Sequence, residues 1–224
     1  MSVPGGLEMS DKTLDLYYAY KSMYLCVYVN IYMLSSSFQG KSYHLSDNWE
    51  WHMHVEDYSL RPINYLEIGT FYGANLLSVA NYYGKHPESK LYAIDPWIDY
   101  NEYPEYKGEQ TNIYNTFLEN VRQSGHADRI TIKRGYSNEE VPKLPDDFFD
   151  IIYIDGNHEP EFVLEDAVLS FRKLKHGGVM IFDDYGWGGA DLTMRGIDAF
   201  LSGYRDKITR IREPRNSQLF IKKN

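Results

Sequence analysis

The sequence predicts an α/β fold: a doubly wound, mostly parallel sheet of seven strands with an antiparallel last strand. Residues 149–154 and 179–182 are apolar runs too short for helices and bounded by turn signals, as buried parallel strands are. Between them, apolar residues recur at helical spacing after Pro160, until Gly177 and Gly178 end the pattern. Both strands of such a unit run in the same direction. Their carboxyl ends, where open α/β sheets bind ligands, therefore lie side by side.

The rest of the chain from residue 64 repeats this alternation of short apolar runs and apolar helical stripes. In chain order, the sequence predicts a strand at 65–68, a helix at 74–83, a strand at 91–94, a helix near 113–121, a strand at 130–133 and, after the first unit, a helix at about 191–204. Two terminal strands, 208–211 and 218–221, are separated by turn residues and predict a hairpin that closes the sheet.

The chain is predicted to divide into an N-terminal segment, residues 1–58, and one α/β domain, residues 59–224. From Asp11 onward, apolar residues roughly follow helical spacing, which predicts a helix packed over the sheet, although β-branched residues leave a strand open. Residues 35–57 hold three histidines and two tryptophans without periodicity. Two of these histidines are two positions apart and do not share a helix face, so we interpret the region as a lid or pocket wall and not as a metal site.

Composition narrows the classes of function. The 224 residues carry a net charge of −9, which argues against a nucleic-acid partner, because Lys and Arg bind its phosphates. Cys26 is the single cysteine, which excludes an internal disulfide and a cysteine zinc site and fits a reducing compartment. The start has no basic leader, and the most apolar stretch, residues 23–34, is shorter than the ~20 residues that span a bilayer. We therefore expect a cytoplasmic protein without a membrane partner.

Acidic residues follow both strands of the first unit. Asp155 follows the first strand, with His158 three residues later, and Asp183 and Asp184 follow the second. Three carboxylates and an imidazole are therefore expected at one edge of the sheet. Adjacent buried carboxylates repel each other without a cation, and oxygen ligands with open positions suit Mg²⁺. The alternative is that these acids cap helices or lie in loops, and that His158 is a surface or helix-start histidine.

A second pattern, Glu67-x-Gly69-x-x-x-Gly73, lies between a strand and a helix. Its glycines let the backbone approach a ligand closely, and the helix start offers free N–H groups. It is not the dinucleotide fingerprint, because Phe71 stands at the second glycine position, and no phosphate-binding GK[ST] follows. A ligand with a positive charge and no phosphate suits Glu67. Asp95, at the end of the next strand, can accept both hydroxyls of a ribose. The alternatives are an ordinary tight turn and a helix-capping aspartate.

The motifs EIGTFYG, AIDPW, GYS, YIDGNH and IFDDY, in this order, resemble those of the class I S-adenosylmethionine (SAM) methyltransferases. The resemblance covers roughly residues 60–224 and is strongest to the macrocin O-methyltransferase type, whose members methylate sugar hydroxyls with a bound divalent metal. It implies a Rossmann-like fold. For the methionine half of the cofactor it implies contacts from Glu67, Gly69 and Gly73, with Thr70 in the same turn, and it implies Asp95 at the ribose. It also implies Tyr136 and Ser137 at the adenine edge, and Asp155 as a further cofactor-binding residue. Trp97 is either a wall of the adenine site or an exposed loop aromatic. The metal ligands that it implies are Asp155, Asp183 and Asp184, with His158 as the catalytic base and Asp155 as the next candidate for that role.

The resemblance implies transfer of the SAM methyl group to a hydroxyl of a carbohydrate, either a small molecule or a glycan, with Mg²⁺ or Mn²⁺ bound. The alternative within enzymes is a catechol-type phenol O-methyltransferase, whose substrate is flat, and the alternative outside enzymes is a non-catalytic SAM-binding domain. Residues 35–58 and 99–107 supply aromatic and acidic side chains that can stack on sugar faces and accept from their hydroxyls. A homo-oligomer and a fusion to other glycan-processing domains are both compatible with the sequence.

Overall fold

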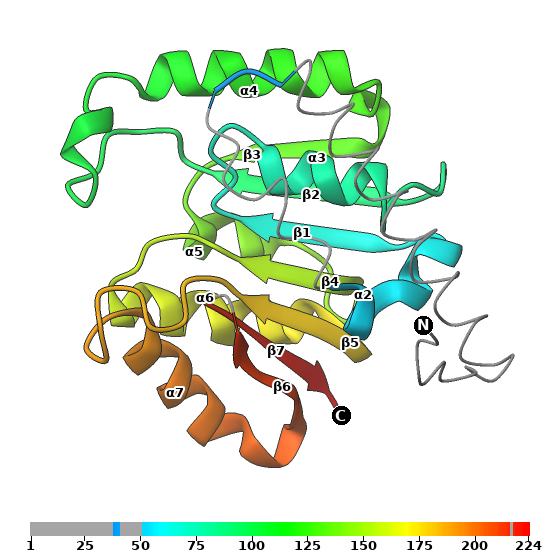
Figure 1. The fold of residues 1–224 in the computed structure, drawn as a ribbon, viewed down its shortest axis with the longest axis vertical. Coiled ribbons are helices and arrows are strands. Elements are labelled where there is room, and N and C mark those ends of the chain that lie inside the picture. The colour runs from blue at the N-terminus through cyan, green and yellow to red at the C-terminus, as the bar shows by residue number, and fades with distance from the viewer. Residues whose placement is uncertain (1–37, 41–50, 216) are drawn as a thin grey trace, which may run out of the picture.

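The structure, a computed structural model, describes residues 38–40, 51–215 and 217–224. Its strands are β1 (Asn64–Ile68), β2 (Lys90–Asp95), β3 (Ile130–Arg134), β4 (Phe149–Ile154), β5 (Leu174–Phe182), β6 (Ile208–Arg215) and β7 (Gln218–Lys223). They form one seven-stranded sheet in the order β3-β2-β1-β4-β5-β7-β6 (Figure 1). Strands β1 to β5 pair in parallel, whereas β7 is antiparallel to both of its neighbours. The predicted fold class is therefore confirmed, including its antiparallel last strand.

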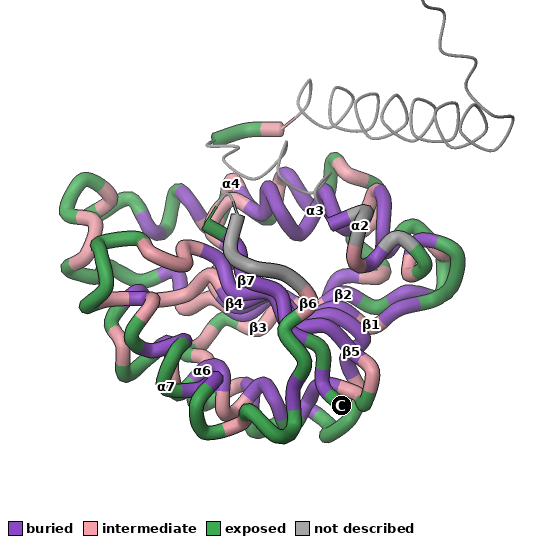
Figure 2. Tube along the Cα trace, turned by 60° about the horizontal axis from the view of Figure 1, so that its bottom comes forward, coloured by how far each residue is buried: buried purple, intermediate pink, exposed green. Residues whose placement is uncertain are grey.

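Helices cover both faces of this sheet. They are α2 (His52–Val55), α3 (Ala74–Asn81), α4 (Gln110–Ser124), α5 (Ser137–Glu140), α6 (Pro160–Lys173) and α7 (Thr193–Tyr204). Short 3-10 turns are found at Glu56–Leu60, Pro104–Tyr106, Ala127–Arg129, Val141–Lys143 and Arg205–Lys207. Figure 2 shows α2, α3 and α4 on one face and α6 and α7 on the other. In the part of the chain that the structure describes, no helix is both long and apolar enough to cross a membrane.

Strand β4 is buried at every position, which explains why its sequence is apolar apart from Asp150. In β4, Ile151 and Tyr153 belong to the apolar layer that α3 and α4 complete, and Ile152 and Ile154 belong to the layer under α6 and α7. This alternation follows from the period of two in a strand. Trp51, which is fully buried in the first layer, stacks on Tyr83 at 5.6 Å and so joins the chain before β1 to the core.

The boundaries differ from the predicted ones where glycines were taken as the end of a helix. Helix α6 ends at Lys173, and β5 begins at the next residue, so Gly177 and Gly178 lie within the strand. A Cβ on Gly178 would lie 3.1 Å from the carbonyl oxygen of Asp150, so the glycine here allows neighbouring backbones to approach. The helix predicted from Asp11 lies outside the described residues.

Candidate active site

The carboxyl ends of β1, β2, β4 and β5 surround a cavity of about 930 Å³. Its wall is made by the loops that follow these strands and by the start of α5, which follows β3. Figure 1 shows the long loops after β2 and β5 on this edge of the sheet. The cavity therefore lies where an open α/β sheet is expected to bind a ligand.

The turn after β1 is packed tightly against the loop after β4. Gly69 has φ of 80°, and a Cβ added to it would lie 1.8 Å from the carbonyl oxygen of Asp155. Gly73, the N-cap of α3, has φ of 86°, and its added Cβ would lie 2.8 Å from the ring of Phe117. Both positions therefore require glycine for conformation and for space.

Asp95 holds this turn by accepting backbone hydrogen bonds. Its Oδ2 accepts from the N–H groups of Thr70 at 3.0 Å and Phe71 at 2.9 Å, and its Oδ1 accepts from that of Trp97 at 2.7 Å. Burial raises the pKa of Asp95, and the three amide donors counteract that rise. Since a carboxylate offers about four acceptor positions, it keeps room for about one further donor.

Glu67 lies at the floor of the cavity in a buried polar network. It is 1% exposed, and its Oε2 accepts hydrogen bonds from the Tyr65 hydroxyl at 2.6 Å and from Asn75 Nδ2 at 2.7 Å. Burial first, and then the charge of Glu67, raise the pKa of Tyr65 well above its ordinary value. The phenol therefore stays a donor, and the network fixes the carboxylate of Glu67 beside the cavity.

Two buried polar atoms in the cavity wall have no hydrogen-bond partner among the described residues. They are the hydroxyl oxygen of Thr70 and the amide nitrogen Nε2 of Gln110. Buried polar groups are rarely left without partners, so both atoms fit contacts to a polar ligand. Thr70 was among the predicted cofactor-binding residues, whereas Gln110, the first residue of α4, carries no motif by which it could have been found.

Of the residues predicted near the adenine, two line the cavity and one does not. Tyr136, 52% exposed, and Ser137 both line the cavity. Trp97 does not line it, because its indole lies in the core, stacked on Phe117 at 4.8 Å, and donates to the carbonyl of Phe71 at 2.9 Å. Trp97 is thus neither in the wall of the cavity nor an exposed loop aromatic.

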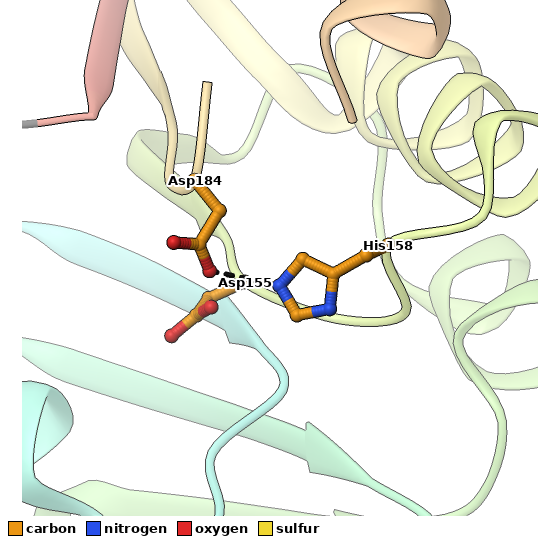
Figure 3. Close-up of side chains that lie close together, drawn as sticks. All are labelled: Asp155, His158 and Asp184. Carbon is orange, nitrogen blue, oxygen red and sulfur yellow. Dashed lines mark hydrogen bonds and ion pairs between the residues drawn. The ribbon is translucent and has the colours of Figure 1, made fainter. Parts of the chain in front are cut away.

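Asp155, His158 and Asp184 come together at the ends of β4 and β5 (Figure 3). One side-chain ligand atom from each lies within 4.8 Å of those of the other two, and His158 Nε2 is 2.8 Å from Asp184 Oδ2. Asp184 has φ of 54°, a left-handed conformation that Asp tolerates better than most residues. Two carboxylates and one imidazole can therefore act on the same ligand.

Asp183 is not part of this cluster, and its carboxylate is bonded elsewhere. Its Oδ2 accepts the hydroxyl hydrogen of Tyr153, which in turn accepts from Gln218 Nε2 at 3.1 Å. The side-chain oxygen of Gln218 accepts from Trp51 Nε1, also at 3.1 Å. The structure therefore brings together two of the three predicted carboxylates with His158, whereas Asp183 belongs to a buried hydrogen-bonded chain.

His158 is held on every side. Its Nδ1 donates to Glu102 Oε1, its face packs on Trp187 at 4.4 Å, and the ring of Tyr103 meets it edge-on at 6.1 Å. Burial alone would lower the pKa of His158, but hydrogen bonds to Asp184 and Glu102, together with their charges, raise it to about 10. In this arrangement the imidazole is protonated at neutral pH. Glu102 was missed from the sequence, where it was one acid of the acidic, aromatic loop 99–107.

Comparison with known proteins gives a family match and a relative among curated proteins. A family model described as "Methyltransferase domain" matches residues 66–185, which is more than half of the chain. Among curated proteins, the uncharacterized protein R132 of Acanthamoeba polyphaga mimivirus is 28% identical over 173 residues, covering 72% of this chain and 68% of that protein.

Solved structures share the fold at low sequence identity. The O-methyltransferase NovP superimposes with a TM-score of 0.62 at 14% identity, covering 91% of this chain and 98% of NovP. The methyltransferase MycE of the mycinamycin biosynthetic pathway, in complex with Mg, SAH and mycinamycin VI, gives a TM-score of 0.57 at 18% identity, covering 87% of this chain and 54% of MycE.

Proposed function

Because the chain belongs to the family of methyltransferase domains, we propose that it transfers the methyl group of SAM to a hydroxyl oxygen of a small-molecule acceptor. Family membership confirms the predicted enzyme class, a methyltransferase. The observation that carries the rest of the proposal is that one cavity is lined both by the glycine turn after β1 and by Asp155, His158 and Asp184. Cofactor and acceptor can therefore meet in a single space.

The cofactor half of the cavity fits SAM in charge and in hydrogen bonding. Glu67 offers a negative charge to a cationic ligand, Asp95 has an acceptor position left for a ribose hydroxyl, and Ser137 also lines the cavity. The unpartnered atoms of Thr70 and Gln110 add one hydroxyl and one amide donor. That MycE holds the demethylated product SAH in a fold of this kind supports the assignment.

The acid and histidine cluster fits a divalent cation such as Mg²⁺ or Mn²⁺. Asp155 and Asp184 offer carboxylate oxygens within reach of one ion, and the buried Oε2 of Glu102 beside the cluster has no hydrogen-bond partner among the described residues. When bound, the ion would supply positive charge that lowers the pKa of the acceptor hydroxyl and offsets the two carboxylates that keep His158 protonated. The Mg reported with MycE supports this part of the proposal.

We assign His158 as the base. Its Nε2 faces Asp155 and Asp184, so it is the ring nitrogen that would take the proton of the acceptor hydroxyl. As the acceptor oxygen bonds to the methyl carbon, the bond from that carbon to sulfur breaks, SAH is left, and the proton resides on His158. Holding the reactants together is expected to give most of the rate enhancement, and a positioned base adds about 10²–10⁴-fold.

A carbohydrate hydroxyl is the acceptor that we favour. The loop after β2 places Tyr100, Tyr103 and Tyr106 in the cavity wall, as expected for residues 99–107, and Trp187 joins them from the loop after β5. Such aromatic faces can stack on a sugar ring, and the acids beside them can accept from its hydroxyls. A flat catechol could use the same aromatic wall, and it remains the second candidate because it also offers two neighbouring oxygens to a metal.

The experiment is an acceptor panel of glycosides and catechols with SAM labelled in the methyl group. We expect label to enter a glycoside in the presence of Mg²⁺ or Mn²⁺, to cease in excess EDTA, and to return when the metal is added back. Labelling of catechols alone would favour the second candidate. Full activity in EDTA would remove the metal from the proposal, and SAM binding without labelling of any hydroxyl compound would contradict O-methyl transfer.

A further inference from the structure

Glu102 contacts His158 across 56 positions of sequence. It lies in the loop after β2, and its Oε1 accepts the Nδ1 hydrogen of His158. Its side chain is 15% exposed and that of His158 is 10% exposed, so the pair is largely shielded from water. Burying a carboxylate is unfavourable unless it is paired, which indicates that the contact is a specific one.

The contact selects which ring nitrogen carries a proton. A neutral imidazole has one donor nitrogen and one acceptor nitrogen, and a carboxylate can only accept. Pairing Nδ1 with Glu102 therefore keeps a hydrogen on Nδ1 and leaves Nε2, the nitrogen 2.8 Å from Asp184, to exchange its proton with a ligand.

The two aromatic neighbours of His158 cannot make this selection. Trp187 packs against the face of the imidazole and Tyr103 meets it edge-on, and both contacts survive a half-turn of the ring about its Cβ–Cγ bond. Such a half-turn would place carbon atoms where Nδ1 and Nε2 now face Glu102 and Asp184. The carboxylates alone distinguish the two orientations, and Asp184 is shared with the metal in the proposed function.

We propose that Glu102 is a positioning residue for His158, a role that rests on the proposed function of His158 as the base. Glu102 orients the ring and fixes its tautomer, so that Nε2 faces the acceptor. Because it comes from the loop that also supplies Tyr103, the base is correctly oriented only when this loop is seated on the cavity. Comparable partners of functional histidines change activity by about 10–100-fold when they are removed.

The test uses the full chain and the variants Glu102→Ala, Glu102→Gln and Glu102→Asp, with Glu109→Gln as the matched control. Glu109 is an exposed glutamate at the start of α4 and does not line the cavity. The first readout is the downfield proton NMR signal of His158 Nδ1–H, assigned by its absence in His158→Gln. We expect the signal to vanish in Glu102→Ala, to move upfield in Glu102→Gln, and to persist in Glu109→Gln.

The second readout is kinetic. Glu102→Ala should lower kcat by about 10–100-fold while the KM for SAM and the melting temperature change little, and Glu102→Asp should recover part of the loss. An unchanged NMR signal and an unchanged kcat in Glu102→Ala would overturn the inference. If the unmodified enzyme methylates no hydroxyl, the proposed function fails, and the NMR signal still reports whether Glu102 positions His158.

Discussion

The carbonyl oxygen of Asp155 occupies the space in which a side chain at Gly69 would begin, since a Cβ built there would lie 1.8 Å from it. The turn after β1 and the loop after β4 therefore meet backbone to backbone. One of them carries predicted cofactor contacts and the other carries the acid and histidine cluster. The two halves of the site are thus held in a fixed relation by the absence of a side chain.

The variant Gly69→Ala tests this contact. The added methyl group would clash with Asp155 and strain a φ of 80°, so we expect the free energy of unfolding to fall by about 3 kcal/mol or more and SAM binding to be lost. Gly125→Ala is the matched control, because its φ is 74° but no atom lies within 4 Å of its added Cβ. That control should lose only about 1 kcal/mol. Equal losses in urea unfolding would show that close packing is not what Gly69 provides.

Asp95 is expected to bind the cofactor and to stabilise the turn after β1. Asp95→Ala removes the acceptor of three backbone N–H groups and of a ribose hydroxyl, so calorimetry should show SAM affinity weakened by roughly 1–3 kcal/mol, with a lower melting temperature.

NAD should not bind to the unmodified protein, because Phe71 stands where a dinucleotide turn needs glycine. NAD binding in the absence of SAM binding would contradict the cofactor assignment.

The neighbouring acids Asp183 and Asp184 should behave differently. Asp184→Asn should weaken Mn²⁺ binding by at least about tenfold and abolish turnover, with SAM affinity retained, because this carboxylate belongs to the cluster. Asp183→Asn changes a group whose Oδ2 is bonded to Tyr153, so we expect a smaller loss of Mn²⁺ binding and a larger loss of stability. Electron paramagnetic resonance titration of Mn²⁺ and urea unfolding measure the two effects. Equal losses of Mn²⁺ affinity in both variants would restore Asp183 as a third ligand.

Asp166, a buried residue of α6 in the cavity wall, should make stability depend on pH. Burial raises the pKa of its carboxyl group to about 7, and the hydrogen bond from Ser137 counteracts this only in part. Between about pH 4 and pH 7 the folded state therefore binds more protons than the unfolded state, so stability falls as pH rises through this window and levels off above it.

Asp166→Asn removes this titration. We expect it to raise the free energy of unfolding on the order of 4 kcal/mol above pH 7 and to have little effect near pH 4, because the pKa is raised by about three units and one unit corresponds to about 1.4 kcal/mol. Glu161→Gln changes an exposed acid of the same helix whose charge does not contribute to the raised pKa of Asp166, and it should leave the pH profile unaltered. A flat profile in the unmodified protein would show that Asp166 ionises normally.

Strand periodicity made the fold predictable, and the same periodicity bears on Asp183. Ile181 lies in the layer that contains Trp51, and Phe182 lies in the opposite layer. Extending this alternation by one residue places Asp183 on the Trp51 face and separates it from Asp184. The signal was present in the sequence, but the motif FDD suggested that both acids act together.

The contacts of Glu102 and Trp97 could not be predicted from the local sequence. The loop after β2 has no periodicity, so nothing in it indicates that Glu102 reaches His158. Trp97 has φ of 45°, and its indole is directed into the core against Phe117. The sequence pattern places the carboxyl ends of β1 to β5 to within one residue, whereas the directions of loop side chains follow from tertiary packing.

The hydrogen-bonded chain from Trp51 through Gln218 and Tyr153 to Asp183 has a consequence for synthesis on the ribosome. Strand β7 lies between β5 and β6, so both of these strands lack that neighbour until β7 has emerged. A nascent chain that already displays Trp51, Tyr153 and Asp183 still lacks the amide that links them. The acidic end of β5 therefore acquires its final surroundings only after translation has passed residue 218, and nascent chains shorter than this expose the edge of β5 to chaperones and to other chains.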